Sequence, residues 1–167
     1  MSMLAPVKID GFGVRRNASD TEVANTENRK KFVRMFASEA IDKGQAVAFD
    51  CNTTEPSTGG YGNTVVPSLV GGASSQFAIG IATEATPTGY DFANPDPIIM
   101  VQVEGICTIA SIDDTNDDPG DMLAAGAGEG LLTITTAVQM PTAVLMAEGS
   151  TGDGGNATIY LINPANL

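Results

Sequence analysis

The stretch IIMVQVEGICTIASI, residues 98–112, decides the fold, because it is the longest run in which a single glycine interrupts residues that favour strands. Apolar side chains alternate with others along its first half, which indicates a sheet with one buried face. The side predicted to face the core is Ile99, Val101 and Val103, and the opposite side is Met100, Gln102 and Glu104. Gly105 predicts a bulge or sharp bend, so the strand continues into a curved or closed sheet.

Short apolar segments alternate with turns elsewhere, and the chain of 167 residues contains 19 Gly and 9 Pro. Residues 31–40 suit a strand or a helix, and we favour the strand because a turn at 41–44 and an alternating segment at 45–50 complete a hairpin. Further strands are predicted at 64–66, 77–83, 122–125, 131–135, 141–147 and 158–162. The predicted fold class is all-β, a small β-barrel or sandwich of short antiparallel strands that comprises residues 31–167.

Residues 1–30 are interpreted as an extended N-terminal arm attached to this body. Small polar residues and a few apolar ones are mixed here, and neither the strand period nor the helix period continues over a useful length. Fully extended, the first 28 residues would reach on the order of 90 Å, far beyond the radius of the body. The arm is therefore expected to tie the body to neighbouring molecules, with a disordered tail as the alternative.

Charge divides the chain at nearly the same point. All 8 basic residues lie at or before Lys43, where 6 acidic residues leave a net charge of +2, whereas 14 acidic residues and no basic ones give the rest of the chain −14. Such a body repels nucleic acid and anionic membranes, so neither is an expected partner. The basic segment favours an acidic partner surface, although ordinary solubilising charges would give the same pattern.

The residue types argue against an enzyme and against a cofactor. The chain has no histidine, which excludes Ser-His-Asp and Cys-His arrangements and removes the commonest zinc ligand. A phosphate-binding loop of the GxxxxGK type is also missing, and a carboxylate pair for glycoside cleavage is only a formal possibility. No apolar run reaches the ~20 residues that span a bilayer, and residues 1–10 do not resemble a signal peptide, so synthesis in a cytoplasm as a soluble protein is expected. Cys51 and Cys107 are expected to be unpaired thiols.

The acidic stretch DDTNDDPGD at 113–121 is the one place that suggests a metal, because carboxylate oxygens suit calcium. Counted from Asp114, however, Pro119 stands where an EF-hand loop requires glycine, and Ala125 stands where it requires glutamate. We therefore predict an acidic turn around Pro119 and Gly120, with calcium binding as the less favoured interpretation.

A succession of short phrases runs through residues 31–162: IDKGQAV at 41–47, IGIA at 79–82, VQVEG at 101–105, PGDML at 119–123, and AEG at 147–149 followed by YL at 160–161. In this order they resemble the small β-barrel capsid decoration, or cement, proteins of tailed bacteriophages. The resemblance implies a structural protein of the virion that binds the major capsid protein on the outer surface of an assembled head. The N-terminal arm is not part of the barrel pattern of that family.

The arm and the basic residues that follow it are expected to make the attachment. The apolar members would pair as an added strand against a capsid edge or a neighbouring copy, and the cations would steer the approach. The predicted partner-binding residues are Val7, Ile9, Phe12, Val14, Arg15, Arg16, Arg29, Lys30, Lys31 and Arg34. On the particle we expect a trimer rather than a dimer, formed from copies that stay monomeric when free.

A receptor- or glycan-binding module of a phage fibre or spike is the alternative function. Tyr61, together with the loop that contains Tyr90 and Phe92, would supply aromatic platforms for a ligand of this kind.

Overall fold

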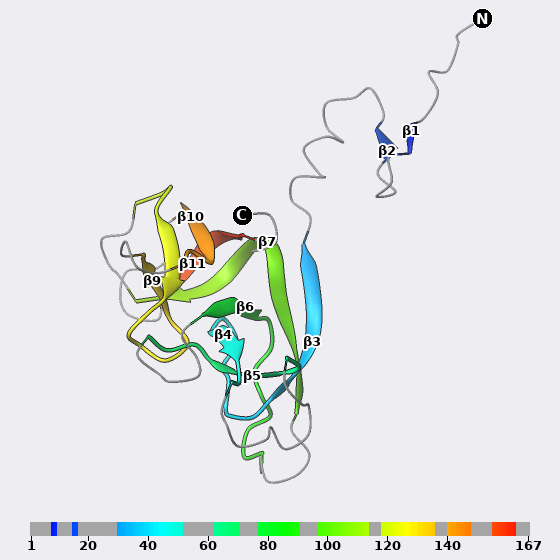
Figure 1. The fold of residues 1–167 in the computed structure, drawn as a ribbon, viewed down its shortest axis with the longest axis vertical. Coiled ribbons are helices and arrows are strands. Elements are labelled where there is room, and N and C mark those ends of the chain that lie inside the picture. Colours follow the sequence, from blue (N-terminus) through cyan, green and yellow to red (C-terminus); the bar gives the residue numbers. More distant parts are fainter. Residues whose placement is uncertain are drawn as a thin grey trace, which may run out of the picture.

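The computed structural model describes residues 30–51, 62–70, 77–90, 97–113, 118–135, 140–147 and 155–162, together with the backbone of two short strands at 8–9 and 15–16. Within these ranges the chain consists of strands and turns and contains no helix (Figure 1). The described residues accordingly include no helix that could cross a bilayer. The predicted all-β fold class is confirmed.

Nine strands build the described body, and each lies at a position that the sequence predicts. They are β3 (Lys31–Ala37), β4 (Ala46–Phe49), β5 (Thr64–Pro67), β6 (Ala78–Ala82), β7 (Ile98–Ile112), β8 (Met122–Ala125), β9 (Leu132–Ile134), β10 (Ala143–Ala147) and β11 (Gly155–Leu161). The segment that suited both a strand and a helix is a strand, although it ends at Ala37. Every second side chain of β11 is buried, as expected for a strand with one face on a core.

Five strands close into a barrel through pairings in the order β3, β5, β4, β6 and β7, and then back to β3 (Figure 1). The apolar residues inside it are Met35, Ala37, Ile41, Val47, Val65, Ala82, Ile99 and Val101. In a closed barrel each strand has a neighbour on both sides, so its backbone N–H and C=O groups can form hydrogen bonds in both directions. The two outermost strands of an open five-stranded sheet would each lack one neighbour.

The other four strands return to β7 as well. Pairings run from β7 through β11, β10, β8 and β9, and the last step is a parallel contact of Ile112 with Leu132. The core of this second ring is Ala46, Ala78, Ile81, Cys107, Ala110, Ile112, Leu123, Ala125, Leu132, Ala143, Leu145, Ala157, Ile159 and Leu161. The first three of these come from β4 and β6, so the barrel wall is also a wall of the second core. The prediction of antiparallel strands is incomplete, since β3–β5 and β7–β9 are parallel.

Strand β7 joins the two rings, and its bend is where the prediction placed it. Residues before Gly105 pair with β3 and β6, whereas those from Gly105 onward pair with β11, and Gly105 has a φ of 88° that side chains disfavour. Gln102 was predicted to face away from the core, but it is buried: its Nε2 donates to the carbonyl oxygens of Glu104 at 3.2 Å and Ile106 at 2.9 Å. Val103 was predicted to face the core and is only half-buried.

The predicted hairpin of residues 31–40 with 45–50 is wrong, because β5 inserts between β3 and β4. The turn between them instead hydrogen-bonds to β6 of the barrel and to the part of β7 that belongs to the second ring. Gly44 N–H donates to Ala82 O at 2.8 Å, and Ser111 N–H donates to Gly44 O at 2.9 Å. Hydrogen bonds to two other strands hold this turn in place, so its position does not depend on pairing between β3 and β4.

In the arm, β1 (Lys8–Ile9) pairs antiparallel with β2 (Arg15–Arg16), so that Lys8 lies opposite Arg16 and Ile9 opposite Arg15. This ladder pairs with no strand of the described body.

Candidate interaction surface

The residues predicted to bind a partner fall into three groups. Val7, Phe12, Val14 and Arg29 lie outside the described residues. Ile9, Arg15 and Arg16 are described through their backbone alone, in the ladder of β1 and β2. The remaining three, Lys30, Lys31 and Arg34, are exposed at the start of β3.

The sequence KFVRMFA explains how β3 presents these side chains. Alternation sends Met35 and Ala37 into the barrel core, while Phe32 and Arg34 remain on the opposite, solvent-facing side. Phe32 is 46% exposed, which is unusual for a large aromatic side chain in a strand. An apolar ring next to a guanidinium therefore marks the outer face of β3.

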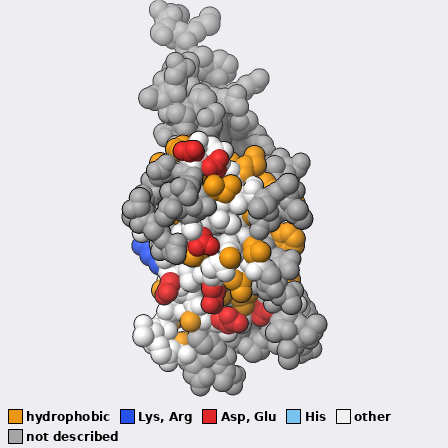
Figure 2. All heavy atoms as spheres, turned by 90° about the vertical axis from the view of Figure 1, so that its left-hand side faces the viewer, with side chains coloured by type: hydrophobic (Ala, Val, Ile, Leu, Met, Phe, Trp, Pro, Cys, Tyr) orange, Lys and Arg blue, Asp and Glu red, His pale blue; other side chains and the backbone are white. Residues whose placement is uncertain are grey.

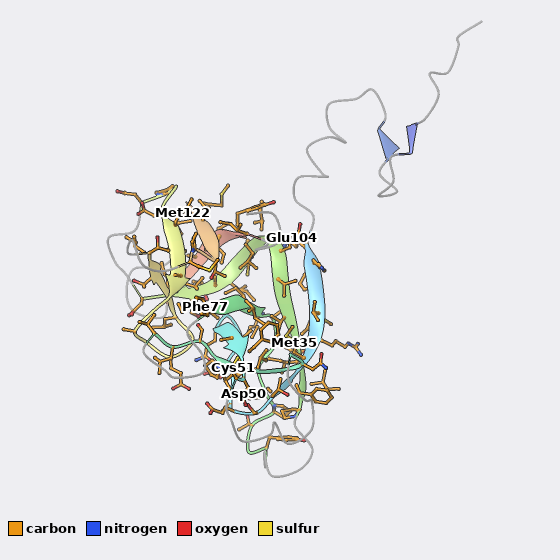
Figure 3. The ribbon with its side chains drawn as sticks, viewed as in Figure 1. Met35, Asp50, Cys51, Phe77, Glu104 and Met122 are labelled. Carbon is orange, nitrogen blue, oxygen red and sulfur yellow. The ribbon has the colours of Figure 1, made fainter. Side chains whose placement is uncertain are left out.

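Lys31 belongs to a different part of this surface. It lies opposite Glu104 of β7 in the strand register, which places an acidic residue beside it. Figure 3 shows Glu104 next to the start of β3 and Met35 further along on the barrel side. Opposite charges across two strands attract each other, so Glu104 partly offsets the positive charge of Lys31. Arg34 should therefore attract an acidic partner more strongly than Lys31 does.

Over the first half of β3, no described strand pairs with the edge that faces away from β7. Phe36 N–H donates to Asn63 O at 2.9 Å on the β5 side, whereas Ala37 N–H donates to Pro97 O at 2.8 Å on the β7 side. Because successive amides of a strand point to alternate edges, the N–H groups of Phe32 and Arg34 face the β5 side. Pairing with β5 begins only at Phe36, so no described strand meets these two groups.

Acidic side chains gather beyond the other end of β3. Glu39 is exposed, and its pKa is raised, first because the surrounding protein removes part of the solvent from its carboxyl and then because Glu129 and Asp50 place like charges near it. Ser38 Oγ donates to Asp50 Oδ2 at 3.0 Å in the same region. Figure 2 shows a face of the body on which acidic side chains recur from top to bottom, while Lys or Arg appears only at one margin.

A second apolar surface, which the sequence analysis missed, crosses the outer face of the second ring. The strand registers align Ile106, Tyr160, Val144 and Met122 in one row over four neighbouring strands. Met122 is 48% exposed, and Figure 3 shows it near the upper end of β8. Alternation within β10 could have revealed the row, because Ala143 and Leu145 are the buried partners of a half-exposed Val144.

The acidic turn and the two cysteines are other features that the sequence analysis singled out. The acidic turn is present, since Asp121 N–H donates to Asp118 O at 3.0 Å and Asp118 N–H donates to Asp121 Oδ2 at 2.9 Å. Residues 114–117, on which calcium binding depends, lie outside the described ranges. Within those ranges no group of three or more His, Cys, Asp or Glu could hold a metal ion. Both cysteines are unpaired, with Cys51 exposed and Cys107 buried.

The aromatic residues considered for glycan binding do not form a described platform. Tyr61 and Phe92 lie outside the described residues, and Tyr90 is half-buried in a turn where its N–H donates to Pro87 O at 3.2 Å. Comparison with protein-family models finds no matching family, and comparison with curated protein sequences finds no match.

Proposed function

We propose that this protein is a capsid decoration, or cement, protein, which binds the major capsid protein on the outer surface of an assembled phage head and links neighbouring subunits. The observation that carries the proposal is the electrostatic and apolar asymmetry along β3. Its start presents Lys30, Phe32 and Arg34 to solvent, whereas Glu39 and its acidic neighbours follow its end. The succession of phrases in the sequence supports the same class of protein.

This asymmetry suits a protein that must sit on a surface in one orientation. A basic patch is attracted to an acidic capsid, and the acidic remainder of a chain with net charge −12 is repelled by it. Repulsion between the bodies keeps free copies apart, so a trimer would form only where the lattice holds copies together. Exposed Phe32 would then contribute apolar contact that salt does not weaken.

The direct test is occupancy on heads that lack the protein, measured by sedimenting the particles over a range of salt. Changing Arg29, Lys30, Lys31 and Arg34 to Ser should slow association at low salt and matter little at 1 M, where the Debye length falls to about 3 Å. Lys43→Ser is the control, because this exposed basic residue belongs to the turn that follows β3 and not to the start of the strand, so its loss should leave occupancy unchanged.

Deletion of residues 1–16 tests the contribution of the arm, and we expect it to abolish occupancy at all salt concentrations. Full occupancy by the deletion variant would move the contact onto the body. Failure of the full chain to bind such heads, together with retention on a glycan array, would replace the proposal by the receptor-binding alternative.

A further inference from the structure

The open edge of β3 has the properties of a strand acceptor. A strand edge with unpaired N–H and C=O groups is a template for another extended chain. In this body the edge is short, because pairing with β5 begins at Phe36. Lys31 before Phe32 and Arg34 after it are both exposed. On its other edge β3 pairs with β7 from Lys31 to Phe36.

We propose that this edge, from Lys30 to Met35, accepts an extended acidic segment of the capsid protein as an additional strand of the barrel. The inference rests on the proposed function and adds a second contact to it, since the body accepts a strand in addition to the attachment that the arm makes. The occupant is an acidic peptide because exposed cations at Lys30 and Arg34 flank the edge. A second copy of this chain is disfavoured, since acidic bodies repel one another.

The geometry also specifies the pattern of side chains on the occupant. An added strand lies about 4.8 Å from its neighbour, and residues directly opposite each other come within about 5.5 Å. An apolar residue opposite Phe32 and an acidic residue opposite Arg34 would therefore lie two positions apart, on the same face. The backbone hydrogen bonds would be made with the outward N–H and C=O groups of these same two residues.

Two substitutions of one residue separate the backbone contribution from the charge. Arg34→Ser removes the guanidinium and keeps the N–H, whereas Arg34→Pro removes both. Proline is tolerated on an open edge, because the N–H it removes is not used within the sheet. We expect Arg34→Ser to weaken head binding at low salt only, and Arg34→Pro to weaken it at least about 10-fold beyond Arg34→Ser at every salt concentration.

Amide hydrogen exchange keeps the test decisive if Arg34→Pro does not fold. In the free protein, the amides of Phe32 and Arg34 should exchange fast while those of Val33 and Met35, which face β7, exchange slowly. On heads all four should be slow. Slow exchange of Phe32 and Arg34 in the free protein would mean that this chain already covers the edge, which would overturn the inference.

The remaining outcomes also decide the matter. Equal occupancy by a folded Arg34→Pro variant and by Arg34→Ser would show that the edge N–H makes no contact, and the inference would fail while the proposed function stood. Absence of binding by the unaltered protein would instead remove the proposed function itself. Protection by a synthetic acidic peptide with the stated pattern, but not by its Asn and Gln counterpart, would support the acidic occupant.

Discussion

Gly44 shows how strongly one residue can depend on the backbone around it. Its φ is 96°, and a Cβ built there would overlap the carbonyl oxygen of Ile109. Gly89 is a matched control, because its φ is 71° but nothing lies within 4 Å of its Cβ position. We expect Gly89→Ala to cost about 1 kcal/mol from backbone strain alone, and Gly44→Ala to cost at least about 2 kcal/mol more. Urea unfolding of both variants measures the difference, and equal losses would contradict it.

Cys107 makes stability depend on pH in the alkaline range. Burial raises the pKa of its thiol above the ordinary 9.0, so the native state holds this proton more tightly than the unfolded chain does. Its contribution is therefore fully present below pH 9 and is lost as pH rises through the raised pKa, by at most about 1.4 kcal/mol per pH unit.

The measurement is the free energy of unfolding between pH 8 and 10.5 for the unaltered protein, Cys107→Ala and the exposed control Cys51→Ala. The slope should flatten only in Cys107→Ala, whatever the loss of stability from its cavity. In the native state a thiol reagent should modify Cys51 rapidly and Cys107 only after unfolding. Identical slopes in all three proteins would count against the buried thiol as the cause.

At the scale of the element, β7 depends on the amide that spans its bend. Gln102 Nε2 donates hydrogen bonds to the carbonyl oxygens of Glu104 and Ile106, which lie on either side of Gly105. Gln102→Met would fill a similar space without a hydrogen-bond donor. We expect a loss of about 2 kcal/mol, because buried carbonyls would lose their partner. Thr108→Val on the exposed side of the same strand should change stability by less than about 0.5 kcal/mol. Thermal unfolding would compare them, and a stable Gln102→Met variant would show that the bend needs glycine alone.

At the scale of the whole molecule, the body should fold without the arm. Both cores lie between Met35 and Leu161, and the ladder of β1 and β2 pairs with no strand of the described body. A shortened protein that begins at Asn28 should keep its β-sheet circular dichroism and its cooperative transition. Removal of residues 155–167 is the contrasting deletion, because it takes away β11 and opens the second ring. A disordered spectrum for the protein without the arm would refute this expectation.

The amino-acid sequence by itself determined where the strands lie and where β7 bends. These features are local: alternation selects extended backbone, and Gly105 permits a φ that other residues disfavour. The sequence also determined the uneven distribution of charge, because no lysine or arginine follows Lys43 in the chain. Of the ten predicted attachment residues, four lie outside the described residues and three are described through their backbone alone.

Only the tertiary structure decided which strands meet. The hairpin prediction failed because β5, distant in sequence, offered β3 and β4 a better shared neighbour, and local alternation contains no information about that choice. Gln102 was assigned to the outside for the same reason, since alternation does not show that its amide is buried and donates to the carbonyls of Glu104 and Ile106 across the bend. The open edge beside Phe32 and Arg34 exists only because β5 starts opposite Phe36, and pairing between distant segments is a property of the folded chain as a whole.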